Sequence, residues 1–199
     1  MYNIRVFSDF ACPFCYFALG LVEKLKEDGI DYTIEWMPFE LDPNAPLEGM
    51  DLFNVYPKEY VVNSINYLSK LGKDLGIIFN NVNSKFNTRR AHLAGYYAKD
   101  QNKYNEYSKS VFKAYFDDKL NIADKNVINE IAESIGLDVK EMNDVVNSGK
   151  YNERFVEDYK LASKYKVTSV PTFFINENIR ISGIKEYNEF KKVFLEIVK

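Results

Sequence analysis

The sequence predicts an α/β protein whose α/β part is interrupted by a large all-α segment. Three observations predict this class. A βαβ pattern opens the chain, only helical periodicity is found over residues 57–166, and a ββα pattern closes the chain. We therefore expect residues 1–56 and 167–199 to form the two parts of one α/β domain, and residues 57–166 to form a helical insertion subdomain.

The opening segment begins with an alternating apolar run at residues 4–7, which predicts a buried strand. A helix that ends at Gly29 follows, and residues 31–37 alternate again with β-forming side chains. Because a right-handed crossover joins parallel strands, we expect these two strands to pair in parallel. Residues 38–46 contain three prolines and predict a loop. The apolar face of the helix consists of Phe14, Phe17, Ala18, Leu21, Val22 and Leu25.

The insertion contains no internal repeat and no low-complexity linker. Asp138 is followed three residues later by Glu141, which is typical of a capping box at a helix start. Gly136 and Gly149 are expected to end helices, and the polar residues 80–86 predict a loop. The predicted helices begin after Pro57, at Asn87 or Thr88, at residue 103, after Asp124, after Asp138 and at residue 152.

The closing segment returns to β-forming residues. Residues 172–176 and 179–182 predict two strands joined by a turn at Glu177 and Asn178, and this spacing suits an antiparallel hairpin. A helix over residues 186–198 completes the chain.

The only two cysteines of the chain lie two residues apart, in the stretch Asp-Phe-Ala-Cys-Pro-Phe-Cys-Tyr that begins at Asp9. This stretch joins the first strand to the first helix, and Pro13 suits the first helical position because its missing N–H is not needed there. A Cys12 thiolate at this position meets free backbone N–H groups and the positive end of the helix dipole. We therefore expect Cys12 to be an activated thiol.

Composition excludes several classes of function. The net charge of −3 gives no basic field for nucleic acid or for an anionic membrane, and no phosphate-binding glycine motif is present. No apolar run approaches the roughly 18 residues that span a bilayer. Residues 1–7 are strand-like and do not resemble a signal peptide, so we expect a cytoplasmic protein. In a reducing cytosol, a C-x-x-C pair is more often catalytic or metal-binding than structural.

Three interpretations of the cysteine pair remain, namely redox catalysis, half of a zinc site and an inert pair. Zinc needs three or four protein ligands, whereas His92 is the only histidine and no second C-x-x-C exists. We therefore expect no metal and favour thiol–disulfide exchange. In this reaction Cys12 attacks a substrate disulfide and Cys15 resolves the mixed disulfide.

Five motifs carry a resemblance to a known family: Ser8-Asp9 with Cys12-Pro13-Phe14-Cys15-Tyr16, and residues 36–43, 87–92, 114–116 and 169–173. With them, nearly the whole chain resembles the DsbA-like thioredoxin-fold family. It is most similar to the FrnE-type branch, which is related to 2-hydroxychromene-2-carboxylate isomerases and kappa-class glutathione transferases. The chain departs from that branch at Phe14, where Trp is more common, and at Ala18 and Ser169, where Gly is more common.

The resemblance implies a thioredoxin fold with a helical insertion and the activity of a protein disulfide oxidoreductase. It implies that Pro171 is a cis-proline facing the two sulfurs, and that an extended substrate peptide can pair with the Val170 backbone. Beyond the redox-active disulfide it implies no cofactor, with glutathione as a possible co-substrate. The expected partners are proteins or small molecules that carry thiols or disulfides.

Other residues carry two interpretations each. His92 either lines a substrate groove above the sulfurs with Pro13 and Phe14 or packs at the junction of the subdomains. Glu40 is either a buried acid that serves Cys15 or a solvated loop residue. Arg89 and Arg90 bind an acidic substrate or form a charged helix face. The aromatic side chains form a groove for unfolded chains or belong to the core; they are Phe10, Phe14, Phe39 and Phe116.

Two rival functions share the fold. A glutathione-dependent transferase or isomerase needs one activated Ser or Cys, and Cys15 argues against it because a neighbouring thiol diverts the first into a disulfide. A non-catalytic, chaperone-like binding module would use the aromatic residues alone. The sequence does not fix the direction of electron flow, the natural substrate or the oligomeric state.

Overall fold

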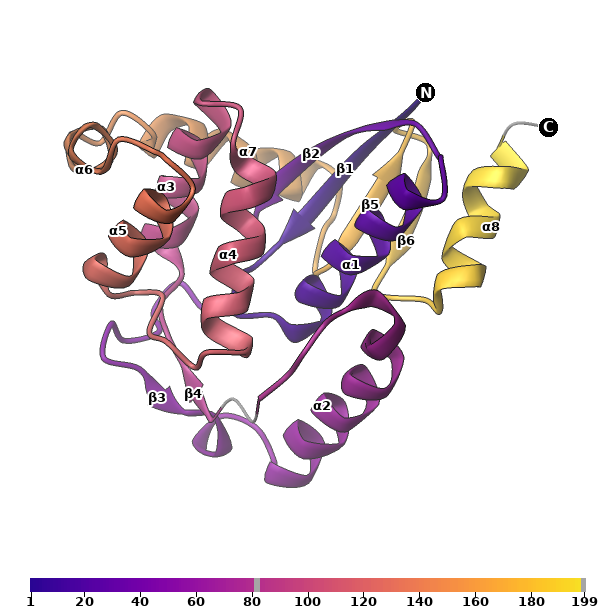
Figure 1. Ribbon diagram of the computed structural model, residues 1–199, viewed down its shortest axis with the longest axis horizontal. Coiled ribbons are helices and arrows are strands. Elements are labelled where there is room, and N and C mark those ends of the chain that lie inside the picture. The colour runs from indigo at the N-terminus through magenta and orange to yellow at the C-terminus, as the bar shows by residue number, and fades with distance from the viewer. Residues whose placement is uncertain (81–82, 198–199) are drawn as a thin grey trace.

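The computed structural model describes residues 1–80 and 83–197 (Figure 1). Its centre is a four-stranded sheet with the order β2-β1-β5-β6. Strand β1 (Tyr2–Ser8) pairs in parallel with β2 (Tyr32–Pro38) and antiparallel with β5 (Thr172–Ile175). Strand β6 (Ile179–Ser182) completes an antiparallel hairpin with β5. The predicted α/β class and the parallel pair are therefore confirmed.

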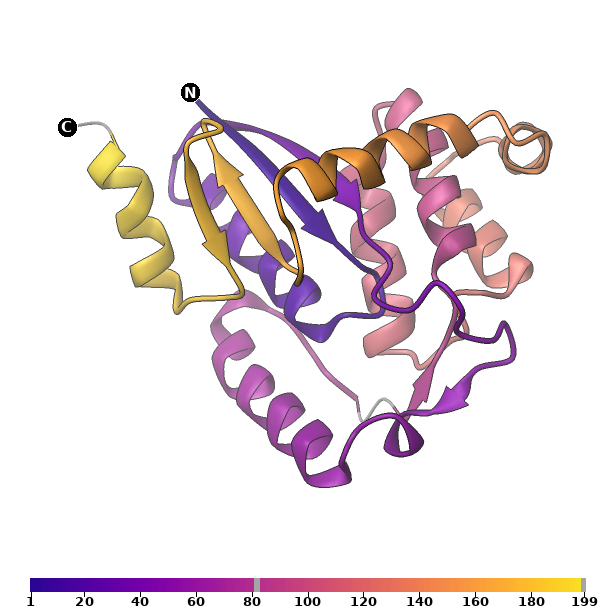
Figure 2. The ribbon, with the colours of Figure 1, turned by 180° about the vertical axis from the view of Figure 1, so that it is seen from behind.

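The register places the most apolar positions of the central strands side by side. Val6 pairs with Trp36 on one side and Phe173 on the other, and all three side chains are buried. Helix α1 (Pro13–Glu27) lies in front of the sheet in Figure 1, and α7 (Asn152–Lys164) lies on the opposite side, next to β2, in Figure 2. Because helices cover both faces, all four residues of β5 and the last three residues of β1 are buried.

Helix α1 begins and ends where the sequence predicts. Pro13 is its first residue, Cys12 is its N-cap in an extended conformation, and Gly29 follows its end with a φ of +77°. The N-cap residue therefore carries the first of the two sulfurs.

The remaining helices agree with the predicted ones. The predicted cap at Asp138 is confirmed, because its carboxylate accepts a hydrogen bond from the Glu141 N–H at 2.8 Å. Asp124 caps the preceding helix in the same way, by accepting from the Asn126 N–H at 2.8 Å. The helices are α2 (Lys58–Gly72), α3 (Arg89–Asp100), α4 (Tyr104–Phe116), α5 (Lys125–Ser134), α6 (Val139–Asn147) and α8 (Tyr187–Ile197). Short 3₁₀ turns cover Leu52–Asn54 and Lys73–Leu75.

The structure differs from the prediction in two places. Two-residue strands, β3 (Met50–Asp51) and β4 (Ser84–Lys85), pair antiparallel, so the loop predicted over residues 80–86 is wrong at residues 84–85. The hairpin turn covers residues 176–178 and includes the predicted turn residues, but β5 ends one residue earlier than predicted, and Asn176 and Glu177 both have positive φ. Residues 81–82, and residue 198 at the predicted end of the last helix, lie outside the described residues.

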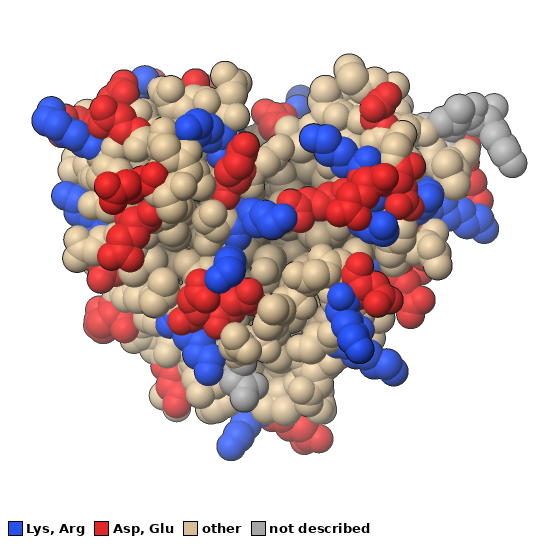
Figure 3. Space-filling model, viewed as in Figure 1, with Lys and Arg blue, Asp and Glu red and all other residues tan. Residues whose placement is uncertain are grey.

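The hydrophobic core runs without interruption from the sheet into the helical segment. Phe7 and Phe17 belong to the same buried cluster as Phe112 and Phe116 of α4. The domain boundaries at residues 56/57 and 166/167 stay predictions. On the face in Figure 3, Lys and Arg side chains are interspersed with Asp and Glu, as expected for a net charge of −3. Within residues 1–80 and 83–197, no helix has the length and apolar character needed to cross a bilayer.

Candidate active site

The two cysteines lie where β1 gives way to α1. The Cys12 N–H donates to the Asp9 carbonyl oxygen at 3.1 Å, and the Cys12 carbonyl oxygen accepts from the N–H groups of Cys15 and Tyr16 at 3.0 and 3.2 Å. These bonds fix the backbone of the first helical turn around the sulfurs. Cys12 is 4% exposed and Cys15 is fully buried, so Cys12 is the more accessible of the two.

The surroundings of Cys15 keep its proton in place. Burial raises the pKa of the Cys15 thiol well above its ordinary value, and the neighbouring Cys12 sulfur adds to this effect. The Ser8 hydroxyl and the Asp9 backbone N–H oppose the shift only in part. Cys15 therefore stays a thiol at neutral pH, and an incoming disulfide meets Cys12 first.

The loop before β5 brings a distant backbone carbonyl to Cys12. The Cys12 thiol donates to the Val170 carbonyl oxygen, with 3.6 Å between sulfur and oxygen, across 158 residues of sequence. The Val170–Pro171 peptide bond is cis, as the resemblance implies. The Thr172 hydroxyl donates to the Ser169 carbonyl oxygen at 2.7 Å and holds the loop in this position.

A cavity of about 320 Å³ opens beside Cys12. Its walls come from the start of α1, the loop after β2, the region from the first 3₁₀ turn into α2, the end of α4 and the loop before β5. Leu41 and Tyr60 are 43% and 55% exposed and give the wall an apolar edge to solvent. The lining residues are Ala11, Cys12, Pro13, Phe14, Leu41, Leu52, Tyr56, Tyr60, Val61, Ser64, Ile65, Lys85, Tyr115, Phe116, Thr168, Ser169 and Val170.

Four predicted site residues, namely Cys12, Pro13, Phe14 and Val170, therefore meet at one cavity. Pro171 itself is buried and is not a lining residue, whereas Thr168, Ser169 and Val170, which precede it, line the wall. The sequence reasoning missed the cavity residues from residues 52–65 and Lys85. These positions carry no local motif, and only the fold brings them next to the cysteines.

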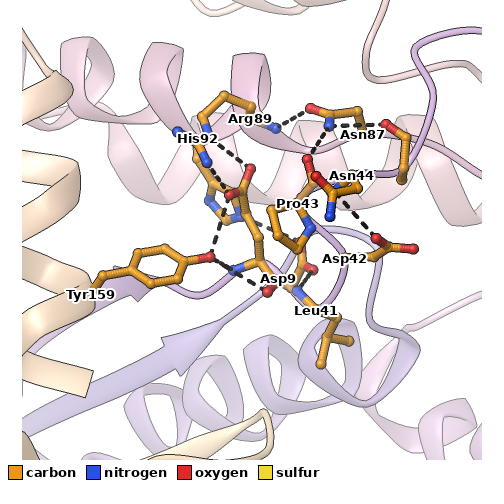
Figure 4. A network of polar contacts seen from close by, with 11 residues as sticks. Asp9, Leu41, Asp42, Pro43, Asn44, Asn87, Arg89, His92 and Tyr159 are labelled. Atoms are coloured by element: carbon orange, nitrogen blue, oxygen red, sulfur yellow. Dashed lines mark hydrogen bonds and ion pairs between the residues drawn. The ribbon is translucent and has the colours of Figure 1, made fainter. Parts of the chain in front are cut away.

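His92 belongs to a network of buried polar residues (Figure 4). Its Nε2 is 3.3 Å from Asp9 Oδ1, and its ring packs against Phe10 and Phe155 at centroid distances of 4.8 and 6.2 Å. His92 is not one of the residues that line the cavity. This geometry favours the interpretation of His92 as a packed residue at the junction with the helical segment.

Asp9 connects that network to the cysteine loop. Its Oδ1 accepts from the Ala11 N–H at 3.3 Å, and its Oδ2 accepts from the Leu41 N–H at 2.7 Å. Burial raises the pKa of Asp9, but its hydrogen bond and electrostatic interaction with His92, together with the Leu41 N–H, outweigh burial and bring the pKa below its ordinary value. Asp9 therefore holds the residues before Cys12 as a buried carboxylate.

Glu40 is buried, so of its two interpretations the solvated loop residue is wrong. Arg89 Nε and Nη2 donate to its two carboxylate oxygens at 2.8 and 2.5 Å, and the Tyr159 hydroxyl lies 3.3 Å from Oε2 (Figure 4). The hydrogen bond to Glu40 raises the pKa of Arg89, and its guanidinium lies 4.1 Å from the Phe155 ring centroid. Arg89 therefore binds an internal carboxylate and joins the loop after β2 to α3.

The predicted aromatic residues divide between groove and core. Phe14 and Phe116 line the cavity, whereas Phe10 is buried in the core and Phe39 stacks on Tyr159 with 6.1 Å between ring centroids. In the part of the chain that the structure describes, no group of three or more His, Cys, Asp or Glu side chains could hold a metal ion.

The chain is similar to known proteins over most of its length. A family model described as DSBA-like thioredoxin domain matches residues 3–194. The chain is 34% identical over 195 residues to the uncharacterized protein YwbO of Bacillus subtilis (strain 168), covering 96% of this chain and 94% of that protein. It is 24% identical over 182 residues to a 2-hydroxychromene-2-carboxylate isomerase of Pseudomonas sp. (strain C18), covering 88% and 82%.

Solved structures share the fold over almost the whole chain. The probable DsbA oxidoreductase SCO1869 from Streptomyces coelicolor aligns with a TM-score of 0.87 at 20% identity, covering 98% of this chain and 89% of that one. The cytosolic disulfide reductase DsbM from Pseudomonas aeruginosa, crystallised with GSH, aligns with a TM-score of 0.72 at 14% identity, covering 98% of both chains. The expected thioredoxin-like fold with a helical insertion is confirmed.

Proposed function

Because the chain belongs to the DSBA-like thioredoxin domain family, we propose that it is a thiol–disulfide oxidoreductase whose catalytic residues are Cys12 and Cys15. The observation that carries the proposal is the contact of the Cys12 sulfur with the Val170 carbonyl oxygen, 3.6 Å away, in the wall of an apolar cavity. A reactive thiol needs a helix N-terminus, a route to solvent and a surface that aligns its substrate. Cys12 has all three.

The reaction proceeds by two exchanges. The Cys12 thiolate attacks one sulfur of a substrate disulfide, whose S–S bond breaks; the other sulfur leaves as a thiolate, and Cys12 is left in a mixed disulfide. Cys15 then loses its proton and attacks the Cys12 sulfur, which releases the second substrate thiolate and forms the Cys12–Cys15 disulfide. Two electrons pass from the dithiol to the substrate, and the two cysteine protons balance the two product thiolates. Oxidation of a substrate dithiol follows the same steps in reverse.

The raised pKa of Cys15 supports this order of steps. A thiol that keeps its proton does not compete with Cys12 for the substrate, and it attacks only after the mixed disulfide has formed beside it. After the first exchange, the disulfide between Cys12 and the substrate lies within one helical turn of the Cys15 sulfur.

Protein chains are the substrate class that the cavity edge fits best. The exposed side chains of Leu41 and Tyr60 can contact apolar residues of an unfolded chain, and the Val170 backbone can pair with an extended peptide that carries the reacting cysteine. Small thiols such as glutathione are proposed as co-substrates that return the pair to its starting state. We place the reaction in the cytoplasm, where ambient thiols favour the dithiol form.

Reduction of insulin disulfides with dithiothreitol as the electron donor tests the proposal. The wild-type protein should accelerate insulin precipitation, and Cys12→Ala should fall to the uncatalysed rate. With dithiothreitol removed after reduction, Cys15→Ala should stop after one exchange with insulin and accumulate a mixed disulfide on Cys12, detected by mass spectrometry. Unchanged activity in Cys12→Ala refutes the proposed chemistry.

A second candidate function is a glutathione-dependent transfer or isomerisation. The relative named 2-hydroxychromene-2-carboxylate isomerase, which covers 88% of this chain, favours it. The two functions separate at Cys15, because an isomerase has no need of a resolving thiol. If Cys15→Ala keeps the full activity of the wild-type protein, the isomerase is favoured. If the variant loses that activity, the oxidoreductase is favoured.

A further inference from the structure

The wall of the cavity contains a buried cation that the exchange reaction itself does not use. Lys85 lies in β4 and borders the same cavity as Cys12, and only 8% of its side chain is exposed. Among the lining residues that the structure describes, Lys85 alone is charged. A buried ammonium is costly unless it has partners, so its position beside a reactive sulfur requires an explanation.

Lys85 has one carboxylate partner among the described residues. Its Nζ lies 3.0 Å from Asp42 Oδ2, and the Tyr56 ring centroid is 5.6 Å away. Asp42 does not line the cavity; its side chain is 30% exposed, and its Oδ1 accepts from the Asn44 N–H at 3.2 Å. Lys85 is therefore the charged residue of the cavity wall, while its partner Asp42 is not a lining residue and is partly exposed to solvent.

The ammonium retains capacity for a second anion. A lysine ammonium carries three donors, and the ion pair with Asp42 accounts for one of them. Apart from Cys12, which reacts as a thiolate, the other lining side chains are neutral, and most are apolar or aromatic. In such surroundings a charge-assisted hydrogen bond is stronger than in water, so a carboxylate that enters the cavity is favoured over a neutral group of the same size.

We propose that Lys85 is a substrate-binding residue that selects thiols and disulfides carrying a carboxylate close to the reacting sulfur. The inference rests on the proposed function, because it assigns the chemical class of the molecule that exchanges with Cys12. A cavity of about 320 Å³ is small for a ligand site, and a sphere of that volume is about 8 Å across. The carboxylate must therefore lie within one or two residues of the sulfur, either in a small acidic thiol or beside a cysteine in a peptide.

Single-turnover reactions of the reduced protein test the inference, because they need no added reductant. The probes are 3,3′-dithiodipropionate, which carries carboxylates, bis(2-hydroxyethyl) disulfide, which is neutral, and cystamine, which carries ammonium groups. Each rate constant is divided by the rate constant of the same probe with dithiothreitol, which removes differences in intrinsic reactivity. For the wild-type protein the normalised rates should follow the order carboxylate, neutral, ammonium.

Lys85→Met removes the charge and keeps the length of the side chain. Since hydrogen bonds to charged groups contribute about 1.5–3 kcal/mol, it should slow the carboxylate probe about tenfold or more and change the neutral probe less than twofold. Lys85→Arg should retain most of the preference. Lys140→Met, which removes a lysine on α6 whose side chain is 89% exposed, is the matched control and should leave all rates unchanged.

Peptide substrates distinguish the two sources of the carboxylate, a small acidic thiol and an acidic residue beside a cysteine. Mixed disulfides of Glu-Cys and Gln-Cys peptides are compared with the small probes, and the arm with the larger Lys85 dependence identifies the source. Equal normalised rates for all three probes, or an equal loss for carboxylate and neutral probes in Lys85→Met, overturns the inference and leaves the proposed function intact. Failure of the wild-type protein to react with any of the three probes instead overturns the proposed function, and the inference with it.

Discussion

Replacing Asp9 with alanine should destabilise the fold by several kilocalories per mole and displace the loop that carries Cys12. The Asp9 and His92 side chains are 2% and 3% exposed, and leaving a buried hydrogen-bonding group without its partner costs about 1–3 kcal/mol. The N–H groups of Ala11 and Leu41 also lose their acceptor. Because these losses overlap, we expect about 4 kcal/mol in total for Asp9→Ala.

Urea unfolding followed by circular dichroism measures this loss, and a double-mutant cycle assigns it. His92→Phe removes the other partner and keeps a ring between Phe10 and Phe155. The Asp9→Ala/His92→Phe double variant should be more stable than the sum of the single losses predicts, by about 1 kcal/mol or more. A loss below about 1 kcal/mol for Asp9→Ala, or strict additivity, refutes the interpretation of Asp9 as the buried anchor of this loop.

The pH dependence provides a second measurement of the same residue. The pKa of Asp9 is lower in the folded than in the unfolded chain, so its contribution to stability is complete above the unfolded value of about 3.9. The contribution is lost as the pH falls through the lower folded value. Asp9→Asn should therefore lose less stability than the wild-type protein between about pH 4 and pH 2. Parallel pH profiles for the two proteins contradict the assignment.

Further predictions concern the resolving thiol and two local structures. At pH 8, iodoacetamide should modify Cys12 and spare Cys15, because burial raises the Cys15 pKa; equal labelling in a peptide map contradicts this. Gly49→Ala should cost about 2 kcal/mol in urea unfolding, since φ is +88° and a Cβ would lie 2.4 Å from the Phe86 ring. Asp138→Ala should cost about 1 kcal/mol through loss of an N-cap, and unchanged stability counts against that role.

Local patterns were sufficient to locate the cysteine pair. The alternating strand, Pro13 and the apolar helix face are all encoded within a short stretch, so the sequence places both sulfurs at the start of α1 without knowledge of the rest of the chain. Pro171 required the family resemblance, because 158 residues separate Cys12 from the Val170 carbonyl oxygen that it contacts.

Burial of the polar residues could not be predicted in the same way. His92 and Glu40 are buried because Asp9 and Arg89 reach them from 83 and 49 residues away. A charged residue in a loop is usually solvated, and only a partner of opposite charge offsets the free-energy cost of burying it. The same holds for Lys85, whose strand is two residues long and pairs with a segment that has no β pattern of its own.

A redox titration of the cysteine pair tests the central claim most directly. The protein is equilibrated in buffers of graded thiol-to-disulfide ratio, quenched with acid and analysed by mass spectrometry. We expect one reversible two-electron transition, with the oxidised species carrying an intramolecular bond between Cys12 and Cys15 and with Cys12 mixed disulfides in the Cys15→Ala variant. A pair that stays reduced across the whole series, or that forms no mixed disulfide through Cys12, contradicts the assignment of these cysteines as a redox centre.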